Sequence, residues 1–127
     1  MIKASEYHKK GYTCGEAIIK AFNDEHNTNI PIKLGSSMGA GFTAGSLCGS
    51  IGGAAVIIGY LKGRENETEA NDARKCTKEL MDNVNSKYGT QLCKELKKNK
   101  VSCAEIIDYT YSELDKICEV SASQDIK

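Results

Sequence analysis

The chain has 127 residues, a hydrophobic fraction of 40%, and 17 basic residues that balance 17 acidic ones. This length suits one compact domain with a hydrophobic core, since domains most often hold roughly 100–150 residues. A net charge of zero provides no field that would attract nucleic acid or an anionic membrane surface, so we expect neither of these partners.

The cysteine content and the N-terminal sequence bear on the cellular compartment. The chain contains six cysteines, and its first ten residues are charged and lack the apolar segment of a secretory signal. The longest apolar run, residues 51–61, is shorter than the roughly 20 residues that a transmembrane helix needs. We therefore expect a cytoplasmic protein, in which cysteines serve catalysis, redox sensing or metal binding more often than structural disulfides.

Apolar residues in the first part of the chain recur with helical rather than strand periodicity. We expect a short helix over residues 4–10 and a second helix over residues 14–26. The second helix opens with a capping box, in which Thr13 and Glu16 each bond the other's backbone amide. Pro31 is suited to the first turn of a further short helix.

A glycine-rich stretch and the apolar run that follows it form the centre of the sequence. We expect residues 39–45 to be a flexible connection and residues 47–62 to be a helix capped by Ser46. A buried strand is the alternative for this run, because periodicity alone does not settle short apolar segments. Its small residues would let a neighbouring helix approach closely, and with the short chain they suggest a homodimer.

The second half of the chain continues the helical pattern. Residues 66–88 form the longest predicted helix, Thr90 can cap a short one, and the sequence Ser-Cys-Ala-Glu at 102–105 is a second capping box that opens the last helix. We therefore predict an all-α domain over residues 1–120, a compact bundle of five to six helices, with a polar tail over residues 121–127.

Four of the six cysteines fall in the first turn of a predicted helix: Cys14, Cys48, Cys93 and Cys103. Free amides and the positive end of the helix macrodipole favour a thiolate there, and can lower the cysteine pKa well below about 8.5. The thiolate is both the nucleophile and the metal ligand. We expect Cys48, with glycines around it, to be the most reactive. The alternative is that cysteine is a buried apolar spacer, which we expect for Cys76 and Cys118.

The order of these cysteines, and the glycine setting of the second one, carry a family resemblance. The stretch Gly-Tyr-Thr-Cys-x-Glu-Ala around Cys14, the glycines after Cys48, and the later Cys93 and Cys103 resemble the four-cysteine family of redox-active proteins written C_GCAxxG_C_C. The resemblance implies redox chemistry at these four cysteines. It also makes Gly49 and Gly53 candidates for contact with a cofactor.

Three kinds of chemistry remain open for the four cysteines. The chain has no Cys-x-x-Cys pair, so thiol–disulfide exchange or electron transfer with a redox partner would need thiols that meet across space. The same four cysteines would suit an iron–sulfur cluster or zinc, for which four is the usual ligand count. The third possibility is a non-catalytic helical bundle that binds a small molecule beside its glycine-rich loop. We expect His8 and His26 to face solvent or cap helices, away from any cysteine.

Overall fold

The computed structural model describes residues 3–118, and within them the prediction of an all-α fold is confirmed. The predicted polar tail, residues 121–127, lies outside the described residues. The helical elements are, in chain order, α1 (Ala4–Lys9), α2 (Cys14–His26), the 3-10 helix η1 (Ile32–Met38), the short turn of π type η2 (Gly41–Gly45), α3 (Gly49–Lys62), α4 (Asp72–Tyr88), α5 (Cys93–Lys98) and α6 (Cys103–Cys118). None of the helices described has the length and apolarity to span a membrane.

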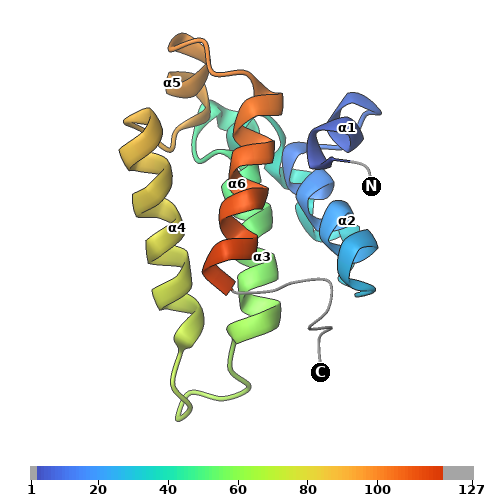
Figure 1. Ribbon diagram of the computed structural model, residues 1–127, viewed down its shortest axis with the longest axis vertical. Coiled ribbons are helices and arrows are strands. Elements are labelled where there is room, and N and C mark those ends of the chain that lie inside the picture. The colour runs from blue at the N-terminus through green and yellow to red at the C-terminus, as the bar shows by residue number, and fades with distance from the viewer. Residues whose placement is uncertain (1–2, 119–127) are drawn as a thin grey trace.

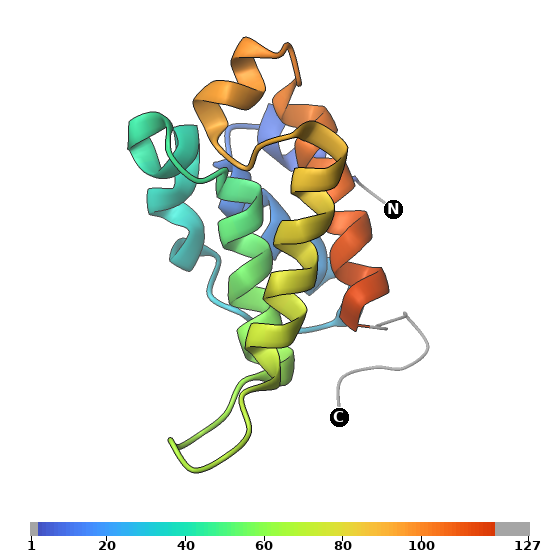
Figure 2. The same ribbon diagram turned by 90° about the vertical axis from the view of Figure 1, so that its left-hand side faces the viewer.

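Three long helices begin at the same end of the molecule. α2, α3 and α6 all run in the same direction, from the end where α5 lies, and α4 runs back alongside α3 and α6 (Figures 1 and 2). α3 lies at the centre and packs against α2, α4 and α6. The N-termini of α2, α3 and α6 are therefore gathered at one end, and their C-termini at the other.

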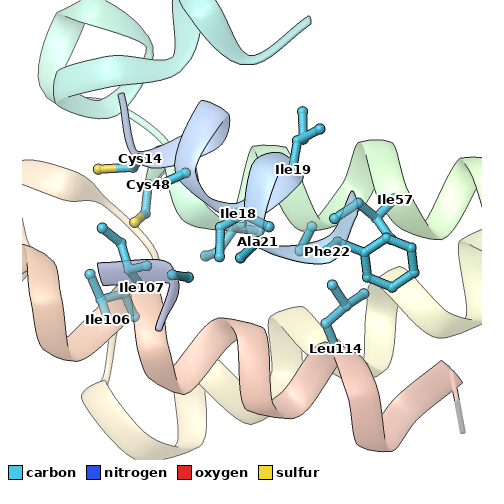
Figure 3. Close-up of a cluster of buried hydrophobic side chains, with 14 of the residues drawn as sticks. Cys14, Ile18, Ile19, Ala21, Phe22, Cys48, Ile57, Ile106, Ile107 and Leu114 are labelled. Atoms are coloured by element: carbon cyan, nitrogen blue, oxygen red, sulfur yellow. The ribbon is translucent and has the colours of Figure 1, made fainter. Parts of the chain in front are cut away.

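The core lies between α2, α3 and α6. Ile18 and Phe22 of α2, Ile57 of α3, and Ile107 and Leu114 of α6 have no exposed surface (Figure 3). Burying a side chain of this size stabilises the fold by about 1.5–3 kcal/mol relative to leaving it in water. These residues recur at helical spacing in the sequence, which is why the pattern predicted the helices correctly.

The small residues of α3 serve packing inside the chain. A Cβ atom on Gly53 would lie 2.8 Å from the carbonyl oxygen of Gly15, and one on Gly49 would lie 2.3 Å from that of Met38. The prediction of a neighbouring helix is thus confirmed, with α2 of the same chain as the neighbour. The homodimer stays a prediction, and these residues no longer support it. The alternative of a buried strand in this run is wrong.

Two helix starts that we predict from a single capping residue differ from those in the structure. α3 begins at Gly49 with Cys48 as its N-cap, in place of the predicted start at residue 47 and cap at Ser46. The residue before α5 is Leu92 instead of Thr90. Thr90 stands two residues earlier, where its hydroxyl accepts from the Leu92 amide at 3.1 Å and donates to Glu95 at 2.6 Å.

α4 begins at Asp72, six residues after the predicted start at residue 66. Side chains hold the preceding segment in a loop, since Arg64 donates to the carbonyl oxygens of Glu67 and Glu69, both at 3.1 Å. The amide of Glu65 also bonds the Glu69 carboxylate at 2.7 Å. These bonds compete with the helix for the same backbone groups.

Candidate thiol site

The four cysteines of the predicted site lie at one end of the molecule. Cys14, Cys93 and Cys103 are the first residues of α2, α5 and α6, and Cys48 immediately precedes α3. All four line one narrow recess of about 10 Å³ that is partly open to solvent. The other residues that line it are Gly41, Gly49, Leu96, Lys97, Val101 and Ile106. All six cysteines of the chain are free thiols.

The capping box of α2 fixes Cys14. The Glu16 amide donates to the Thr13 hydroxyl at 3.1 Å, and the Thr13 amide donates to the Glu16 carboxylate at 2.8 Å, as predicted. The Thr13 hydroxyl also donates to the carbonyl oxygen of Gly35 at 2.8 Å, which ties the start of α2 to η1. At the start of α6 the Glu105 amide donates to the Ser102 hydroxyl at 3.0 Å, which is half of the second predicted box.

A short antiparallel bridge joins the starts of α3 and α5. Leu47 and Leu92 face each other, the Cys48 amide donates to the Gln91 carbonyl at 3.0 Å, and the Cys93 amide donates to the Ser46 carbonyl at 2.7 Å. Cys48 directly follows Leu47, and Cys93 directly follows Leu92. This pairing brings together two cysteines that are far apart in the sequence.

The glycine-rich segment forms a tight turn, and its flexibility stays a prediction. Gly41 has a φ of 64°, a conformation that favours glycine, and its carbonyl oxygen accepts from the Ser46 amide at 2.8 Å. A Cβ atom on Gly41 would lie 2.4 Å from that of Cys93. The turn therefore packs directly against a thiol of the site.

Cys14 and Cys103 lie close together with a histidine beside them. Their sulfur atoms and a ring nitrogen of His8 all lie within 4.8 Å of one another. His8 is half-buried, and its Nδ1 lies 2.9 Å from the carbonyl oxygen of Tyr12. Because a carbonyl only accepts, Nδ1 carries the proton of that bond. The prediction that neither histidine lies near a cysteine is therefore wrong for His8.

Burial changes the expected acidity of two of the thiols. It raises the pKa of Cys14 to about 12, helped by the neighbouring thiols of Cys103 and Cys48. Burial also raises the pKa of Cys48, although the hydroxyl and amide of Ser50 and the amide of Ile51 act in the opposite direction. The amides at the start of α3 thus act as predicted, but desolvation is larger. The prediction of a lowered pKa is wrong for these two thiols.

The remaining predicted residues divide between the site and the core. Gly49 lines the recess, whereas Gly53 packs on Gly15 and is not among the lining residues. Cys118 is buried, which raises its pKa to about 11, and Cys76 packs against the same core. The predicted packing role of these two cysteines is confirmed.

Comparison with known proteins agrees with the pattern of cysteines. The model of a protein family described as "Putative redox-active protein (C_GCAxxG_C_C)" matches residues 12–117. The chain has six cysteines, so the four of the family pattern are not its full set. His8 lies before the matched region. Neither the search of curated proteins nor that of solved structures found a match.

Proposed function

Because the chain belongs to the C_GCAxxG_C_C family of redox-active proteins, we propose that it carries out thiol–disulfide exchange through Cys14 and Cys103. The observation that supports this most is the distance of at most 4.8 Å between the two sulfur atoms. They come from the starts of two different helices, 89 positions apart in the sequence. We infer that the helices form one compact bundle whose cysteine end holds this pair.

The two thiols differ in exposure, which assigns them different roles. Both line the recess, but Cys14 is buried whereas Cys103 is only half-buried. A disulfide that approaches from solvent reaches Cys103 first. We therefore take Cys103 as the attacking thiol and Cys14 as the resolving thiol.

The proposed exchange balances in two steps. The thiolate of Cys103 attacks a disulfide of the partner, breaks its S–S bond and releases one partner thiolate. Cys14 then loses its proton and attacks the sulfur of Cys103 in the mixed disulfide, which forms the Cys14–Cys103 bond and releases the second partner thiolate. The protein dithiol is oxidised by two electrons, the partner disulfide is reduced to two thiols, and the two protons from the protein end on the partner.

Cys48 and Cys93 complete the proposed site. They line the same recess, so a disulfide at Cys14 has neighbouring thiols to which it can pass. Lys97, which also lines the recess, is a positive charge beside the thiolates that form during exchange. That Cys48 is the most reactive of the four stays a prediction.

The experiment is a redox titration with mapped cysteines. The reduced protein is equilibrated with mixtures of oxidised and reduced glutathione, alkylated, and digested for mass spectrometry. We expect a Cys14–Cys103 disulfide that disappears in Cys14→Ser and Cys103→Ser and persists in the control Cys76→Ser. If all six thiols stay free in the most oxidising mixture, the proposal is wrong.

A metal centre is the second candidate, and His8 is the observation that favours it. Two thiols and an imidazole are a ligand set that zinc and iron both accept, and the bond of His8 to Tyr12 orients the ring as metal ligands require. Cys48 or Cys93 would supply a fourth ligand from the same recess. A bound metal would displace the proton that burial holds on Cys14.

Purification without oxygen, followed by counting of zinc, iron and acid-labile sulfide, separates the two candidates. A metal centre predicts a fixed ratio of metal to protein that falls in Cys14→Ser and in His8→Gln. A colourless, metal-free and folded protein would leave thiol–disulfide exchange as the function.

A further inference from the structure

A second group of ionisable side chains lies at the opposite ends of α2 and α6. Glu25 and His26 are the last residues of α2, and Asp115 lies in the last turn of α6. The side chain of His26 has no exposed surface. Its Nε2 lies 3.5 Å from Oε1 of Glu25 and 3.6 Å from Oδ1 of Asp115. The expectation that His26 faces solvent is therefore wrong.

Within residues 3–118, both ring nitrogens of His26 and one carboxylate oxygen of Asp115, Oδ1, lack hydrogen bonds. The distances of 3.5 and 3.6 Å exceed those of N–H···O bonds, which are about 2.7–3.2 Å. Buried polar groups are nearly always bonded, so this arrangement points to a ligand between the three side chains.

We propose that Glu25, His26 and Asp115 bind a divalent metal ion such as zinc. The three ligand atoms lie within 4.8 Å of one another. A zinc ion at about 2.0–2.2 Å from each atom of a tetrahedral set holds those atoms about 3.3–3.6 Å apart. The distances from Nε2 to the two carboxylates, 3.5 and 3.6 Å, fit that spacing.

The electrostatic surroundings favour a cation at this place. The C-terminal ends of α2 and α6 carry the negative ends of their macrodipoles, and the two carboxylates add negative charge. Lys116, the residue after Asp115, lies 3.4 Å from the carboxylate of Glu113 and pairs there. The Tyr111 hydroxyl donates to Oε1 of Glu25 and so holds that carboxylate in place.

The two carboxylates are partly exposed, and this gives a metal ion access to the group. His26 is closed off by Phe22, whose ring centroid lies 4.4 Å from that of His26. The side chains of Glu25 and Asp115 are 21% and 28% exposed, so the ion enters from the carboxylate side. Three protein ligands leave a coordination position for water on that side. This site is independent of the thiol chemistry proposed above.

Nuclear magnetic resonance of the imidazole nitrogens tests the proposal, because the chain has two histidines, His8 beside the thiol site and His26 at the opposite end of α2. Protein labelled with ¹⁵N is titrated with zinc beyond one equivalent, and the nitrogens of His8 and His26 are followed separately. We expect Nε2 of His26 to shift as a metal-bound nitrogen. Manganese, which prefers oxygen ligands to thiolate and would bind the two carboxylates, is expected to broaden His26 and leave His8 sharp.

Isosteric variants measure how much each carboxylate contributes to the affinity for zinc. We expect Asp115→Asn and Glu25→Gln to weaken zinc binding at His26 by more than about tenfold, since even residues that only support a metal ligand typically contribute about 10–100-fold. The exposed Asp82→Asn in α4 is the matched control and should bind as the wild type does. If excess zinc leaves the His26 nitrogens of the folded wild type unchanged, the group is a buried ion pair and the proposal is wrong, whether or not the variants fold.

Discussion

The two ends of α2 and α6 hold opposite kinds of chemistry. At the N-terminal ends lie Cys14 and Cys103 with His8, and at the C-terminal ends lie Glu25 and Asp115 with His26. α2 has 13 residues, which places the two groups about 20 Å apart. Thiols that become anions when they react sit at the positive ends of the helices, and the group that suits a cation sits at the negative ends. One pair of parallel helices thus serves both groups.

The two groups differ in the number of chain segments that form them. The thiol site needs the starts of α2, α3, α5 and α6, the turn η2 and the bridge between Leu47 and Leu92. The carboxylate group is built from two helices, the C-terminal parts of α2 and α6. We therefore expect changes in the shared core to affect both ends, and changes in caps or close contacts of the thiol end to leave the carboxylate end intact.

The largest effect is expected from Phe22→Ala in the shared core. Phe22 is fully buried and covers the ring of His26. Removing such a ring typically lowers the free energy of unfolding by about 3–5 kcal/mol. Urea denaturation measures this decrease in the free energy of unfolding. The same variant should also loosen the packing around Glu25, His26 and Asp115.

The other phenylalanine is the control. Phe42 is 38% exposed, so Phe42→Ala should change the free energy of unfolding far less. Equal losses in the two variants would show that the core does not lie between α2, α3 and α6.

The next effect is expected from Gly53→Ala, which acts on the contact of α2 with α3 near the thiol end. The added methyl group would meet the Gly15 carbonyl oxygen at 2.8 Å and its Cα at 2.9 Å. These are backbone atoms, so relief requires the helices to separate, and overpacking of this kind typically lowers stability by about 1–3 kcal/mol.

Gly59→Ala is the matched substitution at the other end of α3. Gly59 is exposed, and a Cβ atom there meets nothing within 4 Å. Thermal and urea unfolding should therefore show a gain of about 0.5–1 kcal/mol, as expected for alanine in place of glycine inside a helix. A gain at Gly53 as well would mean that α2 and α3 are not in contact there.

The fold could be predicted from the sequence where local patterns decide it. The capping box of Thr13 and Glu16 and the apolar spacing of α2 and α6 are written in neighbouring residues, and the structure has them. The start of α4 was misplaced because the segment before it has helical composition, and bonds from the side chain of Arg64 to loop carbonyls decide against the helix. The bridge between Leu47 and Leu92 had no local signal.

The thiol site was predicted from helix starts, but its acidity and its histidine were not. Position at a helix start favours the thiolate, whereas burial, which depends on the tertiary fold, favours the thiol and is the larger effect on Cys14. His8 reaches the cysteines only because α1 folds back onto the start of α2. His26 and Asp115 are far apart in the sequence, and only the packing of α6 on α2 brings them together.

Of the three variants expected to lose stability, Thr13→Ala should lose the least, and it tests whether the two ends of α2 are independent. The change removes the bond from the Glu16 amide and the bond to the Gly35 carbonyl, and loss of such a cap typically lowers the free energy of unfolding by about 1 kcal/mol. Thr13→Ser keeps the hydroxyl and should stay close to the wild type.

Fraying of the first turn of α2 moves Cys14 and leaves His26, at the far end of the helix, in place. Oxidised glutathione should therefore form less of the Cys14–Cys103 disulfide in Thr13→Ala, while zinc shifts the His26 nitrogens as in the wild type. Equal losses at both ends would show that α2 responds as one rigid unit, so that each group depends on the whole helix instead of its own end.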